Sequence, residues 1–72
     1  MRWEEVVGIN IRNRRLELGR SQEDVAHKVG IDVSYFGQVE RGKRNPTIGV
    51  LGRIADALDI PLVRLLDPPT DS

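Results

Sequence analysis

The sequence of 72 residues has no cysteine, one histidine and three aromatic residues. The lack of cysteine excludes disulfide bridges, thiol catalysis and cysteine zinc sites, and one isolated histidine does not supply the ligands of a metal centre. No apolar run approaches the roughly 20 residues that span a bilayer, and no long apolar segment follows Met1 as it would in a signal peptide. We therefore expect a cytoplasmic protein that holds no cofactor.

The chain length accommodates a single small domain. Hydrophobic residues make up 39% and charged residues 31%, which is typical of a globular protein rather than a disordered one. A chain near this length buries only roughly 60% of the surface that its unfolded form exposes, so it must pack economically or gain stability from a partner. We expect residues 1–66 to form the domain and residues 67–72 to form a flexible polar tail.

The charges balance overall but are unevenly distributed along the chain. There are 11 Lys+Arg and 11 Asp+Glu, and a formal net charge of zero by itself argues against a nucleic-acid-binding protein. However, residues 9–44 contain eight basic and five acidic side chains, whereas residues 55–72 contain one basic and four acidic side chains. A neutral total therefore conceals a basic region and an acidic region.

The apolar pattern predicts an all-α fold, a compact bundle of about five short helices. The first helix is expected from about Trp3 to Leu18, and the last is opened by Pro61. Polar N-caps start the three helices between them, at Ser21, Asp32 and Thr47. Glycines are expected just past helix ends, at Gly19, Gly30 and Gly42. The apolar residues that these helices carry, the candidates for the core, are Val7, Ile11, Leu18, Val25, Ala26, Val29, Phe36, Val39, Ile48, Leu51, Ile54, Ala55, Leu58, Leu62, Leu65 and Leu66.

Four further glycines fall inside the expected helices, at Gly8, Gly37, Gly49 and Gly52. A glycine inside a helix costs about 1 kcal/mol relative to alanine, so we expect each to allow close packing against a neighbouring helix. For Gly37 a functional interpretation is equally open, because a glycine there removes a side chain from an exposed face.

The second and third helices, joined by Gly30-Ile31, form a helix-turn-helix, a motif whose second helix can lie in the major groove of DNA. Many helical proteins contain such a turn, and the residues themselves are more specific. Ser21-Gln-Glu-Asp-Val-Ala-His-Lys-Val-Gly30 and Ile31-Asp-Val-Ser-Tyr-Phe-Gly-Gln-Val-Glu-Arg-Gly42 closely resemble the XRE family of lambda-repressor and Cro-like regulators. The resemblance continues to Leu66. The family includes small stand-alone members, such as restriction–modification controller proteins, and the short chain is similar to these.

The resemblance implies a lambda repressor-like domain that binds a palindromic operator as a homodimer, with the helix from about Val33 to Arg41 in the major groove. The positions that it assigns to base edges are Val33, Ser34, Gly37 and Gln38. Gln38 can bond adenine bidentately and Val33 can pack on a thymine methyl group; the alternative is that all four are solvated surface positions. The positions assigned to the DNA backbone are Arg15, Ser21, Gln22, Tyr35, Arg41, Lys43, Arg44 and Asn45.

Three arginines in and after the first helix need separate interpretation. Arg15 matches a position that forms an ion pair with Glu40 in some relatives, and we expect this pair to orient Arg15 toward the DNA backbone. Arg14 and Arg20 stand where many relatives have apolar residues. Each can bury its stem while the guanidinium stays in water, or can add a phosphate contact.

The C-terminal segment supplies candidate dimer surface: Leu58, Ile60, Leu62, Val63 and Leu66, with Trp3 and Val6 as possible additions. Some or all of these residues can instead complete the core of the monomer. The alternative function is an antitoxin-type interaction module that covers a toxin, with operator binding secondary, and a fragment of a longer regulator is also open. An enzyme is not expected, because His27, Asp24 and Ser21 lie on one predicted helix and do not form a triad.

Overall fold

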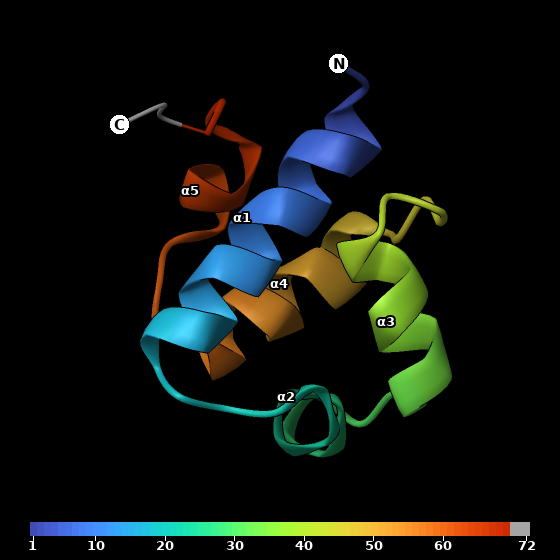
Figure 1. Cartoon of the computed structure of the whole chain (residues 1–72), viewed down its shortest axis with the longest axis vertical. Helices are drawn as coiled ribbons and strands as arrows, with labels where there is room; N and C mark the ends of the chain where they lie inside the picture. The colour runs from blue at the N-terminus through green and yellow to red at the C-terminus, as the bar shows by residue number, and fades with distance from the viewer. Residues whose placement is uncertain (70–72) are drawn as a thin grey trace.

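A computed structural model of the chain describes residues 1–69, and within this range it has five α-helices and no strand (Figure 1). The helices are α1 (Trp3–Glu17), α2 (Gln22–Val29), α3 (Val33–Glu40), α4 (Ile48–Ala57) and α5 (Leu62–Leu66). The predicted all-α class with five short helices is confirmed. Of the expected polar tail, Thr70, Asp71 and Ser72 lie outside the described residues.

The helices begin and end where the local signals predict. The Ser21 hydroxyl accepts a hydrogen bond from the Asp24 amide, and the Asp24 carboxylate accepts one from the Ser21 amide. The Thr47 hydroxyl caps α4 by accepting a hydrogen bond from the Val50 amide. The chain leaves α1, α2 and α3 through glycines with positive φ, at Gly19, Gly30 and Gly42.

The core lies where α1 packs against α3 and α5 while α4 packs against α2 and α5. Phe36 from α3 is fully buried at its centre. In Figure 1, α1 runs between α3 on one side and α5 on the other. The buried apolar residues are Val7, Ile11, Val25, Ala26, Val29, Phe36, Val39, Leu51, Ile54, Ala55, Ala57, Leu58 and Leu65.

Burial on α4 differs from the prediction at its first turn. Ile48 is among the candidates for the core, but it is 66% exposed. It is the first residue of α4, and helical side chains point toward the N-terminus, so its side chain projects beyond the neighbouring helices. The core face of α4 begins one turn later, at Leu51.

The glycines inside helices differ in their surroundings. A Cβ atom at Gly8 would lie 2.7 Å from the Val39 carbonyl oxygen and closer still to that of Glu40, so the predicted close packing is confirmed there, between α1 and α3. The same prediction is wrong for Gly49 and Gly52. A Cβ at Gly52 would meet nothing within 4 Å, and one at Gly49 would meet only the Thr47 hydroxyl.

Arg14 and Arg20, which stand where many relatives have apolar residues, connect the C-terminal end of α4 to the end of α1 and the loop after it through hydrogen bonds. Arg14 Nε donates to the Leu58 carbonyl at 2.8 Å, and Arg20 Nη1 donates to the Ala57 carbonyl. The last carbonyls of a helix have no partner within it and form the negative end of its dipole, so a cation is favourable there. These contacts support the structural interpretation of both side chains over a phosphate contact.

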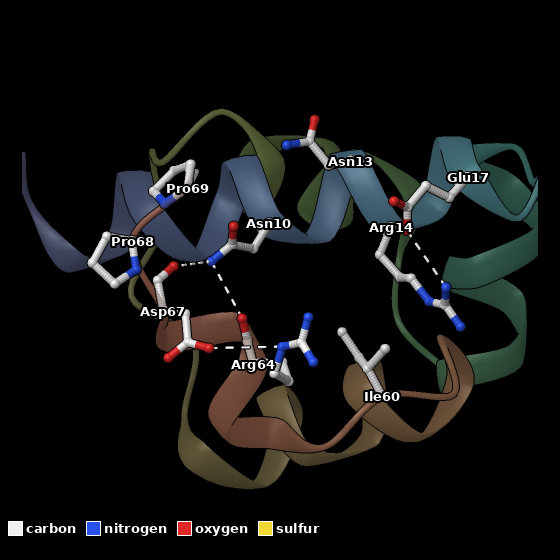
Figure 2. A pocket seen from close by; sticks show the side chains of 9 residues that line it. All are labelled: Asn10, Asn13, Arg14, Glu17, Ile60, Arg64, Asp67, Pro68 and Pro69. Atoms are coloured by element: carbon white, nitrogen blue, oxygen red, sulfur yellow. Dashed lines mark hydrogen bonds and ion pairs between the residues drawn. The ribbon is translucent and has the colours of Figure 1, made fainter. Parts of the chain in front are cut away.

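A polar groove of about 480 Å³ lies beside the contact of α1 with α5 and is lined by residues of α1 and of the segment 60–69 (Figure 2). Asn10 of α1 closes one end, because its Nδ2 donates to the carbonyl of Leu65 at 2.9 Å and to that of Asp67 at 2.6 Å. This side chain fixes how α5 lies against α1. Among residues 1–69, no helix is long and apolar enough to cross a membrane.

Candidate nucleic-acid interface

Burial of one face of α3 in the core determines which of its side chains face the solvent. Phe36 and Val39 are buried, while Val33 and Ser34, in the first turn, are exposed. Asp32 caps this turn, since its carboxylate accepts from the amides of Ser34 and Tyr35. The Asp32 cap therefore fixes the first turn of α3, while the side chains of Val33 and Ser34 in this turn stay accessible to a partner.

Gly37 does not lie on this open face. It is buried, and a Cβ there would lie 3.4 Å from Nη1 of Arg41 and 3.5 Å from Oε1 of Gln22. The side chains of Gln22 and Arg41 thus cover the position that the sequence assigned to base edges. The interpretation of Gly37 as an open gap in the reading face does not fit this arrangement.

Glu40, the last residue of α3, joins three helices through its carboxylate. Arg15 donates to it through Nε at 2.6 Å and through Nη2 at 3.1 Å. Gln22 Nε2 donates to the same carboxylate at 2.9 Å. The side chains of Arg15 and Glu40 are 10% and 3% exposed, so the pair is buried and not a surface ion pair.

The third nitrogen of the Arg15 guanidinium, Nη1, donates to the Arg20 carbonyl at 2.9 Å. The hydrogen bond with Glu40 raises the pKa of Arg15 above its ordinary value, so the cation persists wherever the protein is folded. All three nitrogens of Arg15 thus donate inside the protein, so the guanidinium connects α1 to the end of α3 and to the segment before α2. This placement favours a structural role for Arg15, and its contact with the DNA backbone stays a prediction.

Exposed cations follow α3 directly. Arg41, Lys43 and Arg44 are all exposed, as is Asn45. Arg44 turns back to α3: its Nε donates to Gln38 Oε1 at 2.5 Å, and its guanidinium carbon lies 5.9 Å from the centroid of the Tyr35 ring. Arg44, which is expected to contact the DNA backbone, therefore lies against the face of α3 that is expected to contact bases.

The start of α2 lies beside α3. The Ser21 hydroxyl is occupied as a helix-cap acceptor but can still donate a hydrogen. Gln22 is half-buried and is held at α3 by Glu40. Both residues retain the position at a helix N-terminus where backbone amides and the dipole favour an anion.

The expected dimer residues separate into two groups. Leu58 is fully buried in the core, which removes it from any surface, and Ile60 and Leu62 are half-buried against the core. Val63 and Leu66 are 62% and 44% exposed. Of the two additional candidates, Trp3 is exposed and Val6 is half-buried.

Two roles escaped the sequence reasoning. Asn10 binds the end of α5, and a mid-helix asparagine, which favours turns and caps over helix interiors, was the available signal. The contact between Arg44 and Gln38 crosses the loop after α3, and no spacing rule predicts it. His27 is exposed, and residues 1–69 contain no group of three or more potential metal ligands.

Residues 11–65 match the family model HTH_3, described as helix-turn-helix. The chain belongs to this XRE-type helix-turn-helix family. The HTH-type transcriptional regulator y4dJ of Sinorhizobium fredii, itself uncharacterized, is 36% identical over 72 residues, which cover 100% of this chain and 94% of y4dJ.

Solved structures of HTH_3 relatives share the fold. The hypothetical transcription factor NHTF from Neisseria superimposes with a TM-score of 0.90 at 34% identity, covering 94% of this chain and 78% of NHTF. The restriction–modification controller protein C.AhdI from Aeromonas hydrophila gives a TM-score of 0.83 at 40% identity, covering 86% of this chain and 94% of C.AhdI. The HTH_3 chain is thus a DNA-binding transcriptional regulator rather than an enzyme.

Proposed function

We propose that this regulator binds a palindromic operator as a homodimer, with α3 of each copy in the major groove. The observation that carries the proposal is the exposed first turn of α3 together with the exposed cations Arg41, Lys43 and Arg44 that follow the end of the helix. The major groove admits an α-helix, whose N-terminal residues reach base edges. Cations flanking such a helix neutralise phosphates and fix its register.

The proposed contacts divide into contacts with bases and contacts with the DNA backbone. Val33, Ser34 and Gln38 contact bases, while Gly37, which is covered and has no side chain, makes no base contact. Because this set of base contacts is small, we expect DNA shape to supply a larger share of specificity. The proposed backbone contacts are Ser21, Gln22, Tyr35, Arg41, Lys43, Arg44 and Asn45.

The size of the molecule supports a dimer. Its longest extent is 29 Å, whereas the half-sites of a two-fold operator are centred about 34–36 Å apart. One copy therefore serves one half-site. The apolar residues exposed at α5, Val63 and Leu66, with Trp3 from the start of α1, are the proposed contact between copies.

The physiological role that we favour is a repressor or controller that responds to its own concentration in the cytoplasm. The likeness to the controller C.AhdI supports it. The antitoxin alternative uses the same fold, and a toxin gene adjacent to this one would favour it. A palindrome that overlaps the protein's own promoter would favour the controller.

The test is selection from a random duplex library at near-physiological salt, followed by sequencing. An inverted repeat with half-site centres about 10 base pairs apart is the expected result. Weak enrichment without symmetry, with affinity that collapses as salt rises, would contradict the proposal, because it reports backbone attraction alone.

A further inference from the structure

Arg44 is held over the outer face of α3 at two points. Its Nε donates to Gln38 Oε1 at 2.5 Å, and its guanidinium lies 5.9 Å from the centre of the Tyr35 ring, within the range of a cation–π contact. Tyr35 and Gln38 are three residues apart, so they are neighbours on one face of the helix. The cation therefore sits on the reading face rather than beside it.

This contact changes what Gln38 can recognise. An amide side chain reads adenine when its oxygen accepts from the N6 amino group while its nitrogen donates to N7. Here the oxygen of Gln38 already accepts from a cation. A second donor that approached this oxygen would face the positive charge of Arg44, so the amino group of adenine is disfavoured.

The groups that remain available are all donors. They are Nε2 of Gln38 and the two Nη atoms of Arg44, and none of the three donates to another group among residues 1–69. Guanine presents N7 and O6 in the major groove, two acceptors and no donor. The chemistry of the pair therefore matches the edge of guanine and not that of adenine.

We infer that Gln38 and Arg44 act as one base-reading unit that selects guanine over adenine at one position of each half-site, with Tyr35 supporting the guanidinium. This inference rests on the proposed function, since it requires that α3 enter the major groove. It moves Arg44 from the backbone contacts to the base contacts and replaces the adenine expected opposite Gln38. Lys43 remains a backbone contact, because the structure gives it no hydrogen bond to α3 through its side chain.

The experiment is the library selection run in parallel for the wild type, Arg44→Ala and Lys43→Ala. The wild type should prefer guanine to adenine at one position per half-site by about 5- to 150-fold, the discrimination of a good bidentate contact. Arg44→Ala frees the Gln38 oxygen and should shift that position to adenine. Lys43→Ala, the matched control, should weaken all sequences alike and leave the preference unchanged.

A second measurement isolates the acceptor on the base. Replacing the selected guanine by 7-deazaguanine removes N7, and it should weaken the wild type more than Arg44→Ala, which retains only the Gln38 amide as a donor to this acceptor. If the wild type enriches a site but Arg44→Ala prefers the same base at every position, the reading unit is wrong and the operator proposal stands. If the wild type enriches no site, both are wrong. Circular dichroism of Arg44→Ala verifies that this exposed substitution leaves the helices intact.

Discussion

Glu40 connects α3 to two other helices through hydrogen bonds to its carboxylate. Its carboxylate accepts from Arg15 of α1 and from Gln22 of α2 while it is itself the last residue of α3. Because the carboxylate is removed from water, the guanidinium beside it offsets the cost of burying its charge. One buried ion pair thus connects the stability of the domain to the direction in which α3 points.

Glu40→Gln should lower the free energy of unfolding by about 3 kcal/mol, because Arg15 would keep a buried charge without its counter-ion. Urea unfolding at neutral pH measures this loss. The double variant Arg15→Met/Glu40→Leu is the control, and it should recover most of the stability. A loss below about 1 kcal/mol for the single variant would show instead that water reaches the pair.

Two glycines inside helices provide a matched test of packing. Gly8→Ala should destabilise by about 1–3 kcal/mol, because its Cβ would meet the main-chain carbonyls of Val39 and Glu40, which cannot move independently of α3. Gly52→Ala meets nothing and should stabilise by about 1 kcal/mol through helix propensity alone. The midpoint of thermal unfolding should fall for the first and rise for the second. Shifts of the same sign would refute the close approach of α1 to α3.

At the scale of the element, the end of α4 depends on side chains from another part of the chain. Arg14→Ala and Arg20→Ala should each lower the free energy of unfolding by about 1–2 kcal/mol, the range for a half-exposed charged hydrogen bond. The exposed Arg12 of α1 is the control, and Arg12→Ala should stay within about 0.5 kcal/mol. The salt dependence of DNA binding should not change for Arg14→Ala or Arg20→Ala. A flatter salt slope with unchanged stability would make these arginines phosphate contacts after all.

The sequence predicted the helices well because the signals that start and stop them are local. Ser21, Asp32 and Thr47 each bond an amide two or three residues away, and the positive φ of Gly30 concerns one residue. Burial is not local, which is why Ile48 and Gly52 were misjudged. The partners of Arg14 and Arg20 lie 44 and 37 residues away, so no short pattern contains them.

The candidate interface was predictable to a similar extent. Its position on α3 follows from the motif, and exposure of Val33 and Ser34 follows from the burial of Phe36 and Val39. What each side chain is free to do depends on its neighbours in space. Glu40 withdraws Arg15 from solvent, and that contact had to be seen in three dimensions.

At the scale of the whole molecule, α3 and α5 lie on opposite sides of α1 (Figure 1). Two copies that meet through α5 would leave both α3 helices uncovered. Leu66→Asp should therefore produce monomers in sedimentation equilibrium and weaken operator binding without unfolding the domain, since this side chain is exposed. Leu16→Asp is the control, because Leu16 is also an exposed leucine, 53% against 44% for Leu66, but lies outside the proposed surface. A dimer that tolerates Leu66→Asp would place the contact elsewhere.

The separation of charge along the chain has a consequence for how the protein finds DNA. Three exposed cations, Arg41, Lys43 and Arg44, follow α3, whereas the exposed carboxylates of Asp56, Asp59 and Asp67 lie on α4, after it and after α5, and the formal net charge of the sequence is zero. A neutral protein with separated charges has a dipole moment but no net electrostatic attraction to DNA at long range. The electric field of the duplex therefore orients the protein before short-range attraction begins. We therefore expect random sequence to retain it only briefly. On the proposed function, most of the protein would then stay in free solution, and the occupied fraction of operators would follow its concentration without a large reservoir bound elsewhere on the genome.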